Sequence, residues 1–165
     1  MYIQYKRTHE FQASHFNETN YGRFEDTVNF QNINVEKRVA WTYDNSVEYY
    51  LSAELLIGLL RDIHGHNFKA EVVLLAEVDD SYSSYILADE VIVSVINEWA
   101  GINLSVHPDF LVTGVRATTE NMAQKLCKKI FDKVEGRKSV TNIVVNVTIH
   151  ESDDISSTAV RTSND

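Results

Sequence analysis

The start of the chain alternates apolar and polar positions, a pattern typical of a β-strand. Residues 2–16 are rich in Tyr, Ile, Thr and Phe. Because successive side chains of a strand point to opposite faces, Phe11, Ala13 and His15 share one face. The pattern therefore predicts a strand over 2–16 whose apolar face ends in a histidine.

Later segments repeat the strand pattern. Residues 66–78 contain the apolar run 72–75 and are followed by Asp79, Asp80 and Ser81, which favour a turn. Residues 139–150 are rich in β-branched side chains, and a shorter strand is expected at 157–162. The chain is thus predicted to have one strand at its start, one near its middle and two at its end.

Apolar residues recur at helical spacing in the segments between these strands. This spacing predicts helices at about 52–62, 86–99 and 119–134. Serine or threonine residues stand at the beginning of the first and the last, where they are suited to cap a helix. The last helix carries an apolar stripe of residues four apart: Met122, Leu126, Ile130 and Val134.

Residues 17–51 follow neither the two-residue period of a strand nor the spacing of a helix. They are polar and Asn-rich with scattered aromatic residues, so we expect a long insertion with one short strand near 33–42. A loop of this length inside a compact domain is often functional. Exposed aromatic residues suit an oligomer contact equally well, and the sequence leaves both alternatives open.

The resulting element order predicts the fold class. With the short helix at about 52–62 and the short strand near 33–42 left aside, the order is strand, strand, helix, helix, strand, strand. This order is typical of an α+β domain in which two helices cover one face of a four-stranded antiparallel sheet. We expect a single domain over residues 1–165 that carries the insertion at about 17–51. A sheet of four strands leaves its edges exposed, which favours a homo-oligomer.

Composition narrows the class of partner. With 165 residues, 44% apolar and 24% charged, the chain is suited to one domain with its own core. A net charge of −9 argues against binding to nucleic acid, since no basic surface is available for the phosphates. The chain has one cysteine, its start lacks the apolar core of a signal peptide, and no apolar run approaches the roughly 20 residues of a membrane span. We therefore expect a cytoplasmic protein with no membrane partner.

The stretch His64-Gly65-His66 carries the main candidate chemistry. In an extended segment its two imidazoles point to the same face, and together they supply half of the tetrahedral shell that zinc prefers. His107, next to Pro108 and Asp109, lies in a predicted loop. Cys127 lies one residue from the apolar stripe, and we expect it to be a packing residue.

Four segments, in this order, together resemble the 6-pyruvoyltetrahydropterin synthase and 6-carboxytetrahydropterin synthase family. The resemblance covers residues 2–16 and 63–162, and its most specific part is the His-Gly-His-Asn-aromatic segment. The four segments are Phe11-x-Ala13-x-His15, His64-Gly65-His66-Asn67-Phe68, Ala117-Thr118-Thr119-Glu120-Asn121 and Ile149-His150-Glu151-Ser152. Ala117 stands where the family has proline.

The resemblance implies a fold, an assembly and a site. The fold is the T-fold, whose members form trimers that stack into hexamers and close their sheets into a barrel. Glu151 matches the glutamate that anchors the pterin ring, and Thr118 and Thr119 match polar contacts to that ring. The implied zinc ligands are His15, His64 and His66, a three-ligand set that leaves a fourth position open for substrate.

The catalytic part of the family pattern is missing. The family places a cysteine a few residues before His-Gly-His as general base, but residues 58–63 contain none. His107 matches the catalytic histidine, although Val106 replaces the aspartate before it; Asp109 is the candidate to orient it. A base rebuilt from His107, Asp62 or Glu54 remains open.

Three interpretations follow for function. The first is a zinc-dependent lyase acting on a dihydroneopterin-type substrate, with aldolase-like cleavage of the dihydroneopterin side chain as a variant. The second is a non-catalytic protein that binds zinc and pterin. The third is an oligomer unrelated to pterins in which zinc is structural. The sequence favours a pterin-binding zinc protein, and we expect a lyase-type enzyme.

Overall fold

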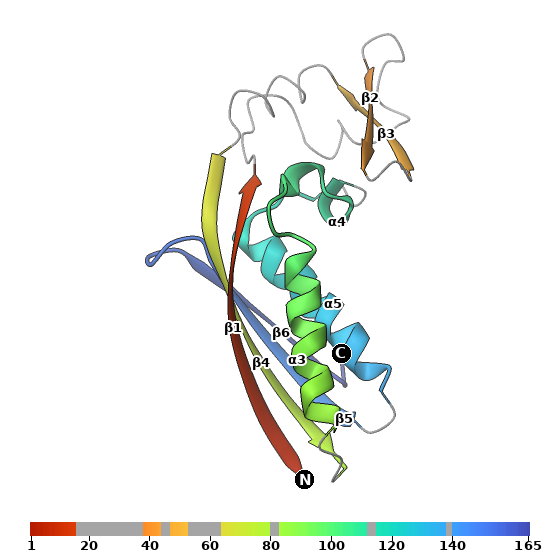
Figure 1. Ribbon diagram of the computed structural model, residues 1–165, viewed down its shortest axis with the longest axis vertical. Helices are drawn as coiled ribbons and strands as arrows, with labels where there is room; N and C mark the ends of the chain where they lie inside the picture. Colours follow the sequence, from red (N-terminus) through yellow and green to blue (C-terminus); the bar gives the residue numbers. More distant parts are fainter. Residues whose placement is uncertain (16–37, 44–46, 53–63, 80–82, 112–114, 138–139) are drawn as a thin grey trace. The chain divides into compact units, whose positions relative to one another are not determined.

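The computed structural model describes residues 1–15, 38–43, 47–52, 64–79, 83–111, 115–137 and 140–165. Contacts divide the chain into two compact units, each described below by itself. Its elements in chain order are β1 (Tyr2–His15), β2 (Arg38–Tyr43), β3 (Val47–Ser52), β4 (His64–Val78), α3 (Ser83–Asn97), η2 (Leu104–Val106), α4 (Pro108–Leu111), α5 (Thr119–Glu135), β5 (Val140–His150) and β6 (Ser156–Thr162) (Figure 1).

A four-stranded antiparallel sheet, in the order β1-β4-β5-β6, is the main feature of the first unit. β4 pairs antiparallel with β5, and β5 pairs antiparallel with β6. The backbone N–H of Val78 donates to the carbonyl of Met1, while the rings of Phe11 and Phe68 stack with centroids 5.4 Å apart. The start of β1 therefore lies beside the end of β4, which makes this pair antiparallel as well.

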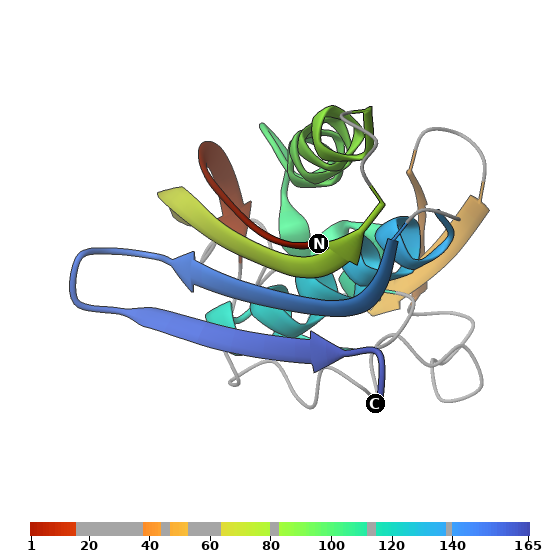
Figure 2. The same cartoon turned by 90° about the horizontal axis from the view of Figure 1, so that it is seen from below.

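One face of this sheet forms the core, because buried positions in β4 and β5 alternate with half-buried or exposed ones. In β4 every second residue from Phe68 to Ala76 is buried, and β5 shows the same alternation from Ile143 to Ile149. Figure 2 shows α3 and α5 on the same face of the sheet. α5 packs on β5 and β6, and α3 packs against α5. No helix in the described part of the chain is long and apolar enough to cross a membrane.

The sequence predicts this unit well. The strands expected at 2–16, 66–78, 139–150 and 157–162 correspond to β1, β4, β5 and β6, and the predicted α+β sheet with two helices on one face is confirmed. The predicted stripe of α5 is buried at all four positions. In α3, the helix expected at 86–99, Ile92, Val95 and Ile96 are buried and Val91 is half-buried.

The second unit contains β2, β3, η2 and α4. β2 and β3 form an antiparallel hairpin, in register from Arg38 opposite Ser52 to Tyr43 opposite Val47. The single strand expected near 33–42 is therefore confirmed in its second half, and β3 is a strand that the sequence did not reveal. The helix expected at about 52–62 falls outside the described residues apart from its first residue, which ends β3. The single-domain organisation stays a prediction.

The segment around Pro108, expected as a loop, contains two short helices. The side chain of Asn103 accepts a hydrogen bond from the N–H of Ser105 and caps η2. Proline at the first position of α4 is favourable there, because that position needs no donor. The N–H of Ser14 donates to the carbonyl of Ile102, which ties the end of β1 to this segment.

Cys127 belongs to the core and not to a reactive site. Its side chain is 2% exposed, and its thiol donates a hydrogen bond to the carbonyl of Val145 on β5 at 3.3 Å. Burial raises the pKa of this thiol to about 11, although the Arg161 guanidinium partly opposes the shift. The thiolate that a nucleophile or general base would need is therefore disfavoured at neutral pH.

This raised pKa predicts a loss of stability at alkaline pH. The unfolded thiol releases its proton near its ordinary pKa, whereas the folded thiol keeps it up to about pH 11. Between these values the unfolded state binds fewer protons, so the free energy of unfolding should fall as the pH rises, by about 1–3 kcal/mol. Urea denaturation of the wild type and of Cys127→Ala at pH 8 and pH 11 isolates this contribution. An equal fall in both proteins would contradict it.

Candidate metal centre

His15 and His64 meet where β1 ends and β4 begins. His15 is the last residue of β1 and is completely buried, whereas His64 is the first residue of β4 and is exposed. Their rings contact edge to face, with centroids 4.5 Å apart and an angle of 68° between the planes. Two imidazoles from separate strands are thus brought into contact, as a shared ligand would require.

The backbone sets the protonation state of His15. Its Nδ1 lies 2.7 Å from the carbonyl oxygen of Ala117. A carbonyl oxygen only accepts hydrogen bonds, so Nδ1 must carry the proton and donate. In the neutral ring the lone pair then resides on Nε2. A metal-binding histidine is usually held in this way, by a hydrogen bond from its other ring nitrogen to a carbonyl or carboxylate.

His66 and Glu151 form the second pair. Nε2 of His66 lies 2.7 Å from Oε1 of Glu151, which directly follows β5. The backbone N–H of Glu151 donates to the carbonyl of Ile155, so the turn between β5 and β6 positions the carboxylate. The ring of His66 also contacts Phe68 edge to face, with centroids 5.3 Å apart. Both side chains of this pair are largely buried, at 26% and 18% exposed.

These side chains have the donor chemistry of a metal site. His15, His64, His66 and Glu151 each offer one ligand atom, and these atoms all lie within 4.8 Å of one another. Imidazole nitrogens with one carboxylate oxygen are ligands that zinc binds in proteins. The His/Glu cluster could therefore hold a metal ion, and its residues fit the zinc that the sequence implied.

The two imidazoles of the His-Gly-His segment are brought together by strand geometry. His64 and His66 occupy the first and third positions of β4, so their side chains leave the strand on the same side. This placement is what the two-residue spacing predicted. The intervening Gly65 is exposed and does not separate the pair.

His107 is buried and is positioned by Asp109, as the sequence suggested. The contact that positions it is the backbone N–H of Asp109 and not the carboxylate. Nδ1 of His107 accepts a hydrogen bond of 3.1 Å from the backbone N–H of Asp109, and the Asp109 carboxylate lies 3.5 Å from the same nitrogen. Because Nδ1 accepts, the proton of the neutral ring is on Nε2. Asp62 and Glu54, the other candidate bases, lie outside the described residues.

Thr118 and Thr119 lie at the start of α5. Thr118 directly precedes the helix, and Thr119 is its first residue and is buried. Oγ1 of Thr119 is 2.9 Å from Oγ of Ser157 on β6 and 3.5 Å from Oε2 of Glu120. Hydrogen bonding within the protein therefore accounts for Thr119, and a contact to a ligand would come in addition.

Two groups of the site were missed from the sequence. The carbonyl of Ala117 holds His15, but a backbone carbonyl leaves no signature in residue type. Ser157 reaches Thr119 across 38 positions, and a lone serine in a short strand gives no signal of its own. Ala117, which stands where the family has proline, therefore contributes to the site through its backbone carbonyl, a group that both residue types carry.

Comparisons with known proteins agree on one family. The family model described as "6-pyruvoyl tetrahydropterin synthase" matches residues 4–161 of the chain. No curated protein matches the chain.

Solved structures give the same fold. The 6-pyruvoyl tetrahydropterin synthase of Caenorhabditis elegans superposes with a TM-score of 0.58 at 19% sequence identity, covering 96% of this chain and 95% of that one. A catalytic-residue mutant of the Plasmodium vivax enzyme, in which a glutamate is replaced by alanine, gives 0.52 at 10% identity and covers 98% and 99%. The Plasmodium falciparum enzyme gives 0.50 at 9% identity and covers 98% of both chains.

Proposed function

The chain belongs to the 6-pyruvoyl tetrahydropterin synthase family, and on this basis we propose that it is a zinc-dependent lyase-type enzyme acting on a dihydroneopterin-type substrate. The observation that carries the proposal is the grouping of His15, His64, His66 and Glu151, whose ligand atoms lie within 4.8 Å of one another. These are the residues to which the family pattern assigns the metal and the pterin ring.

We propose that the three histidines hold the zinc ion. His15 is suited to this role because its hydrogen bond to Ala117 leaves the lone pair on Nε2. A zinc ion with three protein ligands would act as a Lewis acid on the oxygens of the substrate side chain. The donor set also contains Glu151, which gives this carboxylate two possible roles: a fourth ligand or the anchor of the pterin ring.

The anchor is the role we propose for Glu151. A carboxylate has two oxygens and about four acceptor positions, so the contact of Oε1 with His66 leaves acceptor capacity for the amino-pyrimidine edge. Such hydrogen bonds are charge-assisted and therefore strong. Thr118 and Thr119, at the start of α5, are proposed as further polar contacts to the ring.

The tautomer of His107 decides which catalytic role we propose for it and which group we propose as the general base. In the neutral ring His107 carries its proton on Nε2, so this nitrogen can donate a hydrogen bond to the substrate, whereas Nδ1 would have to give up its hydrogen bond from the N–H of Asp109 before it could accept a proton. We therefore propose His107 as a hydrogen-bond donor oriented by Asp109, and Asp62 as the base that takes up the substrate proton. A glutamate is the catalytic residue replaced in the Plasmodium vivax mutant, so a carboxylate can serve within this fold.

We propose a homo-oligomer, a trimer or hexamer, as the working form. β1 and β6 are the edges of the described sheet, and exposed edges of this kind are often closed by a second subunit. Val160 on β6 is 55% exposed, which supports a contact on that edge. The cytoplasmic location expected from the sequence stays a prediction.

The metal assignment predicts about one zinc per chain. His64→Ala and His66→Ala should each lower the zinc content at least tenfold, because loss of one of three ligands removes a large part of the binding free energy. Elemental analysis of purified protein gives this content. His9→Ala is the matched control, since His9 lies on β1 outside the His/Glu cluster, is half-buried and is hydrogen-bonded to Asn97. Full zinc retention in both ligand variants would exclude this ligand set.

The pterin assignment predicts a separation of the two roles of Glu151. If Glu151 anchors the ring, Glu151→Gln should keep the zinc content and weaken binding of neopterin about tenfold or more, because a charge-assisted pair of hydrogen bonds is lost. Calorimetry gives the affinity and elemental analysis the zinc. Asp153→Asn, an exposed neighbour, is the control. Loss of zinc in Glu151→Gln would identify Glu151 as a ligand instead.

The reaction is tested by incubation with 7,8-dihydroneopterin triphosphate and, separately, with dihydroneopterin. Asp62→Asn should lower kcat by about 10²- to 10⁴-fold at unchanged zinc content, as expected for loss of a general base. His107→Asn, whose side-chain oxygen can still accept from the N–H of Asp109, tests the donor while preserving the turn. An unchanged rate in Asp62→Asn would move the base to another group such as Glu54.

Chromatography of the products separates the remaining interpretations. Consumption of the triphosphate indicates the lyase, and cleavage of dihydroneopterin alone indicates the aldolase-like variant. Neopterin binding without turnover of either substrate would favour the non-catalytic zinc- and pterin-binding protein.

A further inference from the structure

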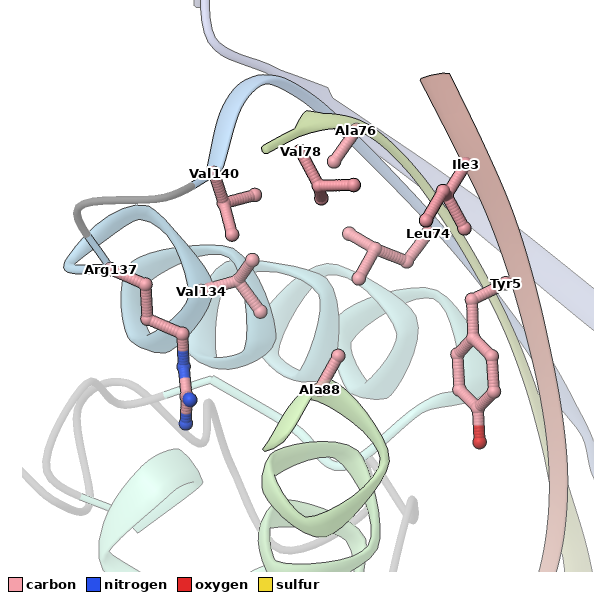
Figure 3. A pocket seen from close by; sticks show the side chains of 9 residues that line it. All are labelled: Ile3, Tyr5, Leu74, Ala76, Val78, Ala88, Val134, Arg137 and Val140. Carbon is pink, nitrogen blue, oxygen red and sulfur yellow. The ribbon is translucent and has the colours of Figure 1, made fainter. Parts of the chain in front are cut away.

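The pocket in Figure 3 belongs to the core of the first unit and is too small for a substrate. Its lining is aliphatic apart from Tyr5 and Arg137, and its enclosed space holds about one water molecule. The hydroxyl of Tyr5 is already engaged, because it donates a hydrogen bond to the carboxylate of Asp89. Ligand contacts of this unit are instead expected at the far end of β5, where Glu151 follows the strand.

Two hydroxyl groups meet close to Glu151. The register of the sheet places Ser157 on β6 opposite Ile149 on β5, two residues before Glu151. Two residues of a strand span roughly 7 Å, so Ser157 lies beside the strand end that carries the proposed anchor of the pterin ring. Oγ of Ser157 is 2.9 Å from Oγ1 of Thr119, the first residue of α5. These four residues all belong to the first unit.

The proton of the Thr119 hydroxyl is used within the protein. Oγ1 of Thr119 lies 3.5 Å from Oε2 of Glu120, and an ionised carboxylate can only accept a hydrogen bond. If Ser157 donates to Thr119, the Thr119 proton goes to Glu120; if Thr119 donates to Ser157, its proton is spent there. Because a hydroxyl has one proton and two lone pairs, at least one lone pair stays available in both arrangements. Thr119 therefore faces a ligand as a hydrogen-bond acceptor.

We propose that Ser157 is a positioning residue, which holds the Thr119 hydroxyl as an acceptor for an N–H group of the ligand. This role rests on the proposed function, because it presupposes that a pterin is bound. The amino-pyrimidine edge of a pterin carries an N–H on the ring and two on the exocyclic amine. A carboxylate such as that of Glu151 takes two of these N–H groups in parallel, so the third is left for Thr119.

The arrangement has a consequence for specificity. A site built to accept a hydrogen bond rejects an analogue that lacks the donor, because the acceptor is then left without a partner. The site should therefore prefer a pterin whose exocyclic amine is unsubstituted. Neopterin and its derivative with one methyl group on that amine are the matched pair of ligands for this preference.

Calorimetric titration with neopterin tests the role of Ser157. Ser157→Ala should weaken neopterin binding about three- to tenfold at unchanged zinc content, because the hydrogen bond that orients Thr119 is lost. Ser157→Thr should restore the affinity to within about twofold, since threonine carries the same hydroxyl and suits a strand. Ser156→Ala is the matched control, because Ser156 is the exposed neighbour of Ser157 on β6.

A double-mutant cycle separates positioning through Thr119 from a merely structural role. In a Thr119→Val background, Ser157→Ala should change the neopterin affinity by less than about twofold, because the hydroxyl that Ser157 orients is gone. The preference of the wild type for neopterin over its methylated derivative should also fall in Ser157→Ala.

Three results would overturn the role of Ser157 and leave the zinc and pterin assignments standing. They are wild-type affinity in Ser157→Ala, an equal loss of affinity in both backgrounds, and an unchanged preference for neopterin over its derivative. Absence of neopterin binding to the wild type would instead overturn the pterin assignment, and the role of Ser157 with it.

Discussion

The candidate site depends on one hydrogen bond, from Nδ1 of the buried His15 to the carbonyl of Ala117. A buried imidazole that lacked this acceptor would leave a polar nitrogen unsatisfied and would be free to adopt the other tautomer. With the bond in place, the ring is fixed and its lone pair is on Nε2. This contact of 2.7 Å thus joins the end of β1 to the residues before α5 and fixes the tautomer of a prospective ligand.

The sheet could be predicted from the sequence because its buried positions follow the two-residue period of a β-strand. The buried positions alternate from Phe68 to Ala76 in β4 and from Ile143 to Ile149 in β5, and the stripe of α5 falls on one side of the helix. Where two apolar residues are adjacent, as at Val91 and Ile92, hydropathy cannot say which of them faces the core, and the packing of α3 decides it. The hairpin of β2 and β3 was missed in part because the polar, Asn-rich residues before it dominate the composition of the insertion, although the hairpin itself contains one Asn and is rich in Val, Trp and Tyr.

The candidate site was predictable in its side chains and unpredictable in its backbone. The spacing of His64 and His66 fixes their common direction once the segment is extended, and the family pattern adds His15 and Glu151. The groups that position them are of another kind: the carbonyl of Ala117, the N–H of Asp109 and the N–H of Glu151. Every residue carries such groups, so residue types give no sign of which ones a fold will use.

The environment of each group also limits what can replace the family's missing cysteine. The chain's one thiol is buried against β5 with its pKa raised to about 11, so it has no access to the thiolate form at neutral pH. Nδ1 of His107 accepts the hydrogen bond from the N–H of Asp109, so the neutral ring presents an N–H at Nε2 as a hydrogen-bond donor and has no lone pair there to accept a proton. A proton acceptor at neutral pH must then be a group whose charged form is its ordinary one, which is the property of a carboxylate. These properties support the proposal of a carboxylate, Asp62 or Glu54, as the base, with His107 as a hydrogen-bond donor.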